Sequence, residues 1–336
     1  MKTHGQKILT VVTEGGKNFG FGHITRCLSI TNIFQQYGYT VFFLINGDDS
    51  IVPLFKRKPV IFNWLENMSR LLESIKTSSI VLIDSMNITD GQILEIERLA
   101  KKIIFIDDEK RRNILDSGFV VDWTILSDKK NHFYPKKENV TYLLGSKYTP
   151  LRPEFSCAIK NPIKEGVGSV MVSFGGIDLR NLSPIILKKL NEFLPNCKKN
   201  IVIGNGFTNI KDIEKYKDKN TTFVFNANTS KMIDLMQTTD LAIASGGQTL
   251  YELVKIGTPT IAILLVENAK DDTMGWHEVG SVDNIGWWND ENLVLNLKKS
   301  IELLKDKNTR QRMQDKGAPY TTPNGAVNLV NRVLGN

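Results

Sequence analysis

The sequence predicts an α/β protein with two doubly wound domains, each built on a parallel sheet. Short apolar runs alternate with stretches of helical periodicity along the chain, which is the pattern of strands separated by helices. The runs are rich in Val and Ile and are bounded by Gly, Asp and Asn, as in strands buried on both faces. The length of 336 residues exceeds what one ordinary core accommodates and favours two domains.

The first series of elements occupies residues 1–152. We predict strands at residues 7–13, 40–45, 79–83, 103–107 and 142–144, with helices at residues 23–37, 63–76 and 88–101. Alternation of this kind builds a right-handed parallel sheet. Residues 148–153 include two prolines, which disfavour helix and strand alike, so this segment is expected to connect the domains.

The alternation restarts at Ser169 and defines a second domain, residues 153–320. We predict strands at residues 170–174, 199–203, 221–225, 240–244 and 259–265, with helices at residues 181–194, 250–256 and within 291–334, where Gly317-Ala318-Pro319 makes a break. Residues 321–336 are expected to form a C-terminal helix that packs back on the first domain. Ligands bind at the carboxyl ends of parallel strands, so two such Rossmann-like domains are expected to face a central cleft.

The composition excludes several classes of protein. Apolar residues make up 41% of the chain and charged residues 24%, so the chain fills its cores and is not disordered. The net charge of +7 fits ordinary solubility, an anionic ligand or a weak peripheral contact with an acidic membrane. Lys and Arg are spread along the chain, so no nucleic-acid partner is expected. The sequence does not determine the oligomeric state.

The N-terminus and the cysteine content indicate a cytoplasmic protein. The first apolar run is too short for a signal peptide, and the longest run, residues 261–266, is far too short for a transmembrane segment. The three cysteines form no disulfide framework. The four histidines, which include His4 and His132, are not closely paired, so we expect neither a metal site nor a cofactor.

A glycine loop that carries a histidine follows the first predicted strand. Gly20-Phe21-Gly22-His23 opens the predicted helix, and Arg26 lies one turn further on. A helix N-terminus disfavours the imidazolium, so we expect a neutral His23 that acts as a general base near pH 7. A capping or packed histidine is the alternative. Arg26 either contacts a phosphate or carboxylate of the ligand or pairs with an acidic side chain.

A second glycine loop has the features of a diphosphate site. Ser245-Gly246-Gly247-Gln248-Thr249 stands between the strand 241–244 and the helix 250–256. Exposed N–H groups at the helix start and the Thr249 hydroxyl would form a cradle for a diphosphate, although a tight turn also needs glycine. Glu252 lies about one turn further on and suits two ribose hydroxyls, or else it lies on a solvated face.

Other polar residues stand at the ends of predicted strands. Ser173-Phe174-Gly175-Gly176 is the matching loop at the start of the second domain, and it either approaches the ligand or only turns the chain. Asp84 either faces the ligand or caps the next helix. Asp107-Asp108-Glu109 runs into three basic residues, which favours a self-compensated surface turn over a magnesium site. Asn268 follows the strand 259–265.

In their order along the chain, these motifs resemble the PseG/SpsG group. The motifs are the histidine loop with Arg26-Cys27-Leu28, Asp84-Ser85, Ile106-Asp107-Asp108, Gly145 to Arg152, Ser173 to Gly176, Gly246 to Glu252, and Glu267-Asn268. The group comprises the UDP-2,4-diacetamido-2,4,6-trideoxy-β-L-altropyranose hydrolase of pseudaminic acid synthesis and its spore-coat polysaccharide relatives. The resemblance covers residues 7–330, and more distantly the chain is similar to MurG-type glycosyltransferases.

This resemblance implies a GT-B fold and a nucleotide-sugar hydrolase of nonulosonic acid or surface polysaccharide biosynthesis. The second domain would hold UDP, with Thr249 and Glu252 at nucleotide-binding positions and Asn268 near the sugar. His23 would activate a water that attacks the anomeric carbon of a UDP-linked diacetamido-deoxy sugar, with inversion and release of UDP. A metal is not expected.

Two departures from the family pattern keep other functions open. The family's Asp-Ser-Tyr reads Asp84-Ser85-Met86 here, and its Asn-Gln reads Asn268-Ala269. An inverting GT-B glycosyltransferase with a UDP-sugar or other nucleotide-sugar donor is therefore the alternative. A catalytically idle protein that binds a sugar nucleotide is a third hypothesis. A nicotinamide dehydrogenase is disfavoured because the glycines do not follow the G-x-G-x-x-G spacing.

Overall fold

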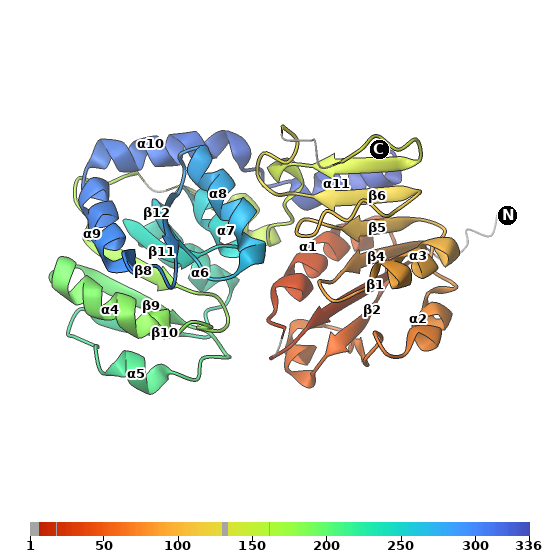
Figure 1. The fold of residues 1–336 in the computed structure, drawn as a ribbon, viewed down its shortest axis with the longest axis horizontal. Helices are drawn as coiled ribbons and strands as arrows, with labels where there is room; N and C mark the ends of the chain where they lie inside the picture. The colour runs from red at the N-terminus through yellow and green to blue at the C-terminus, as the bar shows by residue number, and fades with distance from the viewer. Residues whose placement is uncertain (1–6, 18, 130–133, 161) are drawn as a thin grey trace. The chain divides into compact units, whose positions relative to one another are not determined.

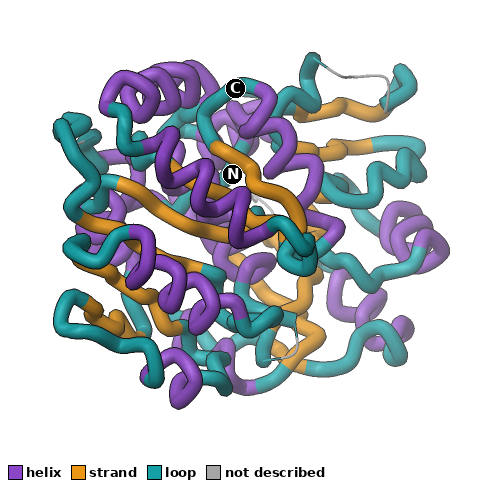
Figure 2. Tube along the Cα trace, turned by 60° about the vertical axis from the view of Figure 1, so that its left-hand side comes forward, coloured by secondary structure: helices purple, strands orange, loops and turns teal. Residues whose placement is uncertain are grey.

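The computed structural model describes residues 7–17, 19–129, 134–160 and 162–336. His4 and His132 lie outside these residues. The chain divides into two compact units, one formed by residues 1–150 with 324–336 and the other by residues 151–323. Within each unit, strands run between helices (Figures 1 and 2).

The first unit is a parallel sheet whose described residues form seven strands in the order β3-β2-β1-β4-β5-β6-β7. The strands are β1 (Ile8–Gly15), β2 (Thr40–Gly47), β3 (Val60–Ile61), β4 (Ile80–Asp84), β5 (Ile103–Ile106), β6 (Gly118–Asp122) and β7 (Val140–Leu144). The helices are α1 (Gly22–Gln36), α2 (Met68–Ile75), α3 (Asp90–Leu99) and α11 (Gly325–Leu334).

Helices cover the first sheet on its apolar surfaces. On one face, buried side chains of α2 and α3 pack on those of β1, β4 and β5, including Val12, Ile83 and Phe105. Helix α1 packs on β1 and β2, and α11 packs on α1. The blue α11 therefore lies beside the red α1 in Figure 1, although nearly 300 residues of sequence separate them.

The second unit repeats this plan with six strands among the described residues, in the order β10-β9-β8-β11-β12-β13. The strands are β8 (Ser169–Ser173), β9 (Lys198–Ile203), β10 (Thr221–Phe225), β11 (Leu241–Ser245), β12 (Thr260–Leu264) and β13 (Asp283–Trp287). The helices are α4 (Leu182–Phe193), α5 (Ile210–Glu214), α6 (Thr229–Thr238), α7 (Gln248–Ile256), α8 (Lys270–Glu278), α9 (Leu293–Leu304) and α10 (Lys307–Gly317). Helices α4 and α9 share one buried cluster with the sheet, while α6 and α7 contact each other and the strands β8, β11 and β12.

In both sheets the strand order reverses beside the first strand of the unit. Strand β1 lies between β2 and β4, and β8 lies between β9 and β11. The carboxyl ends of the two strands that flank such a switch point are where open parallel sheets bind ligands. The loops that leave β1, β4, β8 and β11, with the helices α1 and α7 that follow two of them, carry most of the residues predicted from the sequence, and Asn268 follows β12.

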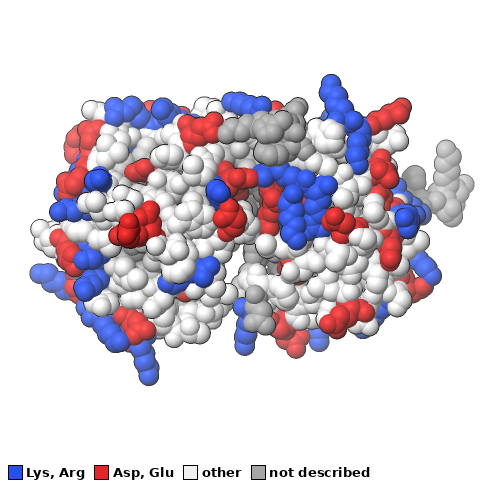
Figure 3. All heavy atoms as spheres, viewed as in Figure 1, with Lys and Arg blue, Asp and Glu red and all other residues white. Residues whose placement is uncertain are grey.

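The doubly wound α/β class is confirmed, and most predicted elements are present. The sequence-based prediction did not include the strands β3, β6 and β13 or the helices α5, α6 and α8. The predicted break at residues 317–319 is confirmed, since α10 ends at Gly317. On the face shown in Figure 3, Lys and Arg side chains are interspersed with Asp and Glu side chains.

Candidate functional site

Hydrogen bonds between described residues hold the segment before His23 in the first unit. Gly16 and Gly20 exchange hydrogen bonds at N···O distances of 2.9 and 2.8 Å, and Asp48 accepts a hydrogen bond from the Lys17 N–H. Gly20 has φ +77°, a conformation that favours glycine. These contacts precede α1, which begins at Gly22 and carries His23 as its second residue.

His23 is held by a carboxylate from the neighbouring strand. Its Nδ1 lies 2.8 Å from Oδ1 of Asp84, the last residue of β4, and β4 pairs directly with β1. Nη2 of Arg26 also lies 3.0 Å from Nδ1. Because a carboxylate accepts but does not donate, the shorter contact with Asp84 assigns the proton to Nδ1 and the lone pair of the neutral ring to Nε2. Asp84 does not cap α3, because Thr89 makes the capping box of that helix.

Arg26 pairs with acids rather than standing free. Its Nε and Nη2 donate to the two oxygens of Asp84 at 2.7 and 2.5 Å, and Nη1 donates to Asp108 at 3.0 Å. The guanidinium lies 5.0 Å from the centre of the Trp123 ring. Two carboxylates and an aromatic face fix the orientation of a planar cation closely, so Arg26 links β4 to the loop after β5.

These side chains line a pocket of about 220 Å³, including space open to solvent. His23, Arg26 and Asp84 contribute to it together with Met86 and the loop 107–112. The expectation of a self-compensated surface turn at this loop was wrong, because Asp107 is 4% exposed and the Asp108 side chain 9%. Both turn inward, Asp107 to the Arg112 N–H and Asp108 to Arg26.

The electrostatics of His23 differ from the sequence-based expectation. Burial lowers the pKa of the imidazole, but the charge of Asp84 and its hydrogen bond raise it, and the net pKa is above 6.5. The expectation of a neutral ring rested on the helix N-terminus alone and did not include Asp84. The structure therefore favours a protonated His23 at pH values where an ordinary histidine is already neutral.

The two carboxyls that hold Arg26 respond in opposite directions. Burial raises the pKa of Asp84, but Arg26 and His23 outweigh this effect and keep that pKa well below its usual range. Burial and the neighbouring negative charges raise the pKa of Asp108 in spite of Arg26. Asp84 is thus the permanent anion of the site, and Asp108 is the carboxyl that takes up a proton more easily.

Glu14 supports the pocket and was not predicted from the sequence. Its carboxylate is 1% exposed and accepts hydrogen bonds from the Ser85 hydroxyl, the Met86 N–H and the Asn87 amide at 2.8–3.0 Å. These three residues form the loop after β4 that carries Met86 into the pocket. A single acidic residue at the end of an apolar run gave no signal for this role.

The predicted cradle of the second unit lies at the end of β11. Gly247 caps α7 with φ +101°, and a Cβ there would meet nothing within 4 Å. Gly246 is glycine for a different reason, since its Cβ would come within 2.7 Å of atoms of Ala269 and Thr273. Ser245, Gln248 and Thr249 complete this half-buried turn.

Glu252 is buried in α7 and has a partner that the sequence did not indicate. Its two carboxylate oxygens accept from Nε and Nη2 of Arg152, each at 2.9 Å. Arg152 also donates to the Thr229 hydroxyl. Burial raises the pKa of Glu252 even with this guanidinium beside it. The solvated helix face is therefore excluded, because Glu252 is 4% exposed.

The remaining predicted residues of the second unit stand at neighbouring strand ends. Ser173 ends β8 and pairs in register with the residue before Ser245. Gly175 has φ +86° and open space at its Cβ position, whereas the carbonyl of Gly176 accepts the Gly206 N–H. Asn268 is exposed in the short turn after β12, beside the Ala269 that packs on Gly246.

Two negative findings concern the part of the chain that the structure describes. No group of three His, Cys, Asp or Glu side chains is placed there to hold a metal ion. No described helix has the length and apolar character needed to cross a membrane.

No family model matches the chain, but curated proteins do. It is 21% identical to the spore coat polysaccharide biosynthesis protein SpsG of Bacillus subtilis over 95% of this chain and 96% of that protein. It is 26% identical over 76% of its length to the uncharacterized protein MJ1062 of Methanocaldococcus jannaschii, and spans 55% of that protein. It is 24% identical over 74% of its length to a Helicobacter pylori protein named pseudaminic acid cytidylyltransferase and UDP-2,4-diacetamido-2,4,6-trideoxy-β-L-altropyranose hydrolase, of which it spans 43%. The predicted resemblance is confirmed by SpsG and the hydrolase.

Solved structures confirm the GT-B fold. MurG of Acinetobacter baumannii superimposes with a TM-score of 0.70 at 14% identity, over 98% of this chain and 100% of that one. The complex of Staphylococcus aureus MnaA with UDP gives a TM-score of 0.70 at 12% identity, over 98% and 96% of the two chains.

Proposed function

We propose that this PseG/SpsG-like chain, which has the GT-B fold, hydrolyses a UDP-linked diacetamido-deoxy sugar at its anomeric C–O bond. The observation that carries the proposal is the pairing of His23 with Asp84 in a pocket at the switch point of the first sheet. The names of the H. pylori relative and of the MnaA complex support UDP as the nucleotide. The place of the reaction would be the biosynthesis of a nonulosonic acid or another surface polysaccharide.

In this reaction His23 is the general base. Asp84 holds the proton on Nδ1, so Nε2 accepts a proton from water. The water oxygen forms a bond to the anomeric carbon as the bond from that carbon to the UDP oxygen breaks. The bonding electron pair leaves with UDP, and attack from the opposite side inverts the configuration. Asp84 stabilises the imidazolium that forms, as a buried carboxylate does in other His–Asp pairs.

The second unit would hold the nucleotide. The α7 N-terminus with Gly247 presents N–H groups to the diphosphate, and the Thr249 hydroxyl adds a donor. Arg152 takes one lone pair from each oxygen of Glu252, and each oxygen retains a second one, so this carboxylate can still accept from two ribose hydroxyls. Ser173, Gly175, Gly176 and Asn268 stand at neighbouring strand ends, where we place the rest of the substrate.

Isotope labelling tests the bond that is cleaved. Hydrolysis of the UDP-sugar in ¹⁸O-water is expected to place the label on the sugar and leave the released UDP unlabelled. Proton NMR during the first turnover is expected to show inversion at the anomeric carbon. Label in the terminal phosphate of UDP would contradict attack at the sugar, because it would show attack at phosphorus.

An inverting glycosyltransferase is the second candidate, and the fold it shares with MurG favours it. The same His23 would then take the proton from an acceptor hydroxyl. Rapid release of UDP without any acceptor would exclude this candidate. Release that appears only after an acceptor extract is added would favour it over hydrolysis.

Replacement of Gly22 tests whether the substrate occupies the space beside His23, because the change is not expected to affect the stability of the fold. A Cβ on Gly22 would meet nothing within 4 Å, and its φ lies outside the left-handed region. Gly22→Ala is therefore expected to leave the melting temperature unchanged or slightly raised, because Ala favours helix. If the sugar occupies the space beside His23, kcat/KM falls about tenfold or more through misplacement of the reacting carbon.

Gly91→Ala is the matched control for Gly22→Ala. Gly91 also lies in the first turn of a helix of the first unit, with open space at its Cβ position. Its replacement is expected to leave both stability and kcat/KM unchanged or slightly improved. Equal activity of the two variants would show that the substrate does not approach Gly22.

A further inference from the structure

A second pocket lies at the amino ends of strands in the second sheet. The predicted cradle lies at the carboxyl end of one of these strands. Its lining includes the residues just before two strands, Asp240 before β11 and Thr258-Pro259 before β12. Its volume is about 310 Å³, including space open to solvent. Strand β11 has five residues, so its amino end is about 16 Å from the loops at its carboxyl end.

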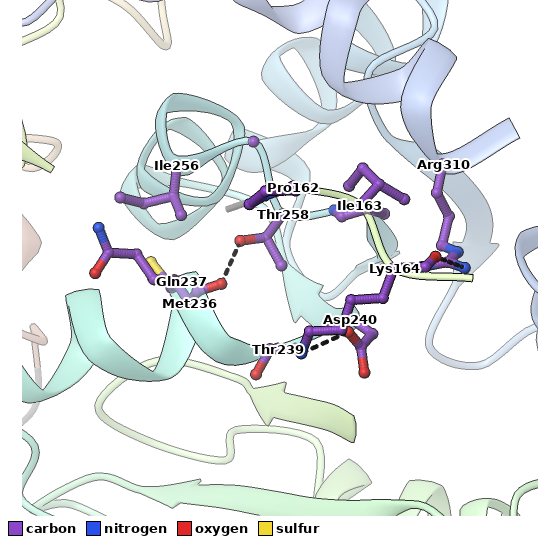
Figure 4. A pocket seen from close by; sticks show the side chains of 12 residues that line it. Pro162, Ile163, Lys164, Met236, Gln237, Thr239, Asp240, Ile256, Thr258 and Arg310 are labelled. Carbon is purple, nitrogen blue, oxygen red and sulfur yellow. Dashed lines mark hydrogen bonds and ion pairs between the residues drawn. The ribbon is translucent and has the colours of Figure 1, made fainter. Parts of the chain in front are cut away.

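Arg310 of α10 is the unusual feature of this pocket (Figure 4). The residue is 0% exposed. Its Nη2 donates to the carbonyls of Lys164 and Glu165 at 2.9 and 3.0 Å, while Nε and Nη1 are buried without a hydrogen-bond partner. Burial lowers the pKa of this guanidinium, as expected for a charge that is incompletely compensated.

A second unpartnered group lines the same pocket. The Thr239 hydroxyl is buried and has no hydrogen-bond partner. The polar groups around it are already satisfied: the Thr258 hydroxyl donates to the Met236 carbonyl, and Asp240 accepts from Gly168 and Ser169. The unpartnered donors of this pocket are therefore the Nε and Nη1 groups of Arg310 and the Thr239 hydroxyl, and hydrogen-bond acceptors would satisfy them.

The charges of the lining residues favour an anion as such an acceptor. Lys164 lies 3.2 Å from Asp240, and its side chain is 61% exposed. These two charges offset each other. The charges of Glu165 and Asp306 also act on Arg310. Each of these two carboxylates has a cation of its own, Lys307 and Arg312 respectively, so the charge of Arg310 is the excess. Buried N–H groups of a cation that lack partners cost free energy, which an oxyanion in contact with them would recover.

We propose that this pocket binds a small oxyanion, a phosphate or a carboxylate, between Arg310, Thr239 and Lys164. The site is separate from the nucleotide cradle proposed at the carboxyl end of β11 and does not depend on it. The ligand would tie the segment 162–165 to α10, because Arg310 already joins these two parts of the second unit.

The test measures the binding of inorganic phosphate to the full chain by calorimetry and thermal shift. Sulfate, acetate and formate are the comparison ligands, chloride at equal ionic strength is the salt control, and every titration is repeated with saturating UDP. We expect saturable binding of phosphate or of a carboxylate that persists with UDP present. Comparison of the affinities for acetate and formate with those for phosphate and sulfate shows whether the site prefers a carboxylate or a phosphate.

The decisive variant is Thr239→Val, which removes only the unpartnered hydroxyl. It is expected to weaken anion binding about tenfold and to leave turnover of the UDP-sugar unchanged. Lys164→Ala is expected to weaken binding several-fold at low salt. Lys215→Ala removes a similarly exposed lysine, which pairs with Asp212 away from the pocket, and is expected to have no effect. Arg310→Met is expected to abolish binding if the variant folds.

Two results would overturn the proposal. One is stabilisation by phosphate or sulfate that is equal in the wild type and in Thr239→Val, since these salts stabilise proteins through exclusion from their surface. The other is the absence of saturable binding together with a higher melting temperature of Thr239→Val, which would show that the pocket holds water only. Loss of UDP binding with anion binding retained would instead count against the proposed function alone.

Discussion

Replacement of His23 by Ala is expected to lower kcat for the UDP-sugar by about 10²–10⁴-fold, the usual loss for a general base. Binding of UDP is expected to remain within a factor of about two, because we place the nucleotide on the second unit. Added imidazole is expected to restore part of the lost rate in the Ala variant, since the deleted ring leaves room beside Asp84. Single-turnover kinetics and UDP calorimetry measure the two effects separately.

His23→Gln and His277→Ala complete this experiment. Gln keeps a polar side chain beside Asp84 but cannot accept the proton, so it is expected to be as inactive as Ala. His277 lies on α8 with its side chain 47% exposed, and its loss is expected to change nothing. Full activity of His23→Ala would exclude the general base and would leave a catalytically idle binding protein as the better description.

The fold could largely be predicted because most strands carry apolar runs that are buried on both faces. Strand β4 is buried along its whole length, and its sequence is correspondingly apolar. Strand β13 could not be predicted, since only Ile285 of its five residues is buried. Strand β6 has an apolar run, but the described residues 107–117 before it contain no helix, so the strand–helix alternation fails at that point.

The candidate site could be predicted only where a residue with suitable chemistry directly follows a recognisable apolar run. The His23 loop and Asp84 follow apolar runs, and strand pairing brings them together. The Arg152–Glu252 pair joins residues 100 positions apart, and neither residue has a local signal for the other. Asp108 was misjudged because the basic residues after it suggested local compensation, whereas Arg26, 82 residues earlier, is its partner.

The pH dependence of the reaction follows from the pairing of His23 with Asp84. The base must be neutral to accept a proton, and the pKa of His23 is raised above 6.5. We therefore expect kcat/KM to rise with pH through an apparent pKa above 6.5. The stability contribution has the opposite sign: a raised folded-state pKa stabilises the fold below the unfolded pKa, and this contribution is lost as pH rises through the folded value.

Asp84→Asn is expected to lower kcat by about 10²-fold or more and to move this pH profile to lower pH. The change removes the charge that raises the pKa of His23, so the ring becomes neutral at lower pH. An amide can donate to Nδ1, which shifts the proton to Nε2 and turns the lone pair away from the substrate. A positioning role thus predicts a large loss in kcat, a small change in KM and a displaced acid limb.

The stability of the same variant separates this role from a purely structural one. The pKa of Asp84 is lowered in the folded chain, so its charge stabilises the fold above the unfolded pKa of about 4, and this contribution is lost as pH falls through the folded value. Asp84→Asn is expected to be less stable than the wild type at pH 7, with a difference that shrinks in acid. A variant that loses stability in this way yet keeps the wild-type kcat and pH profile would show that Asp84 holds Arg26 in place without orienting His23.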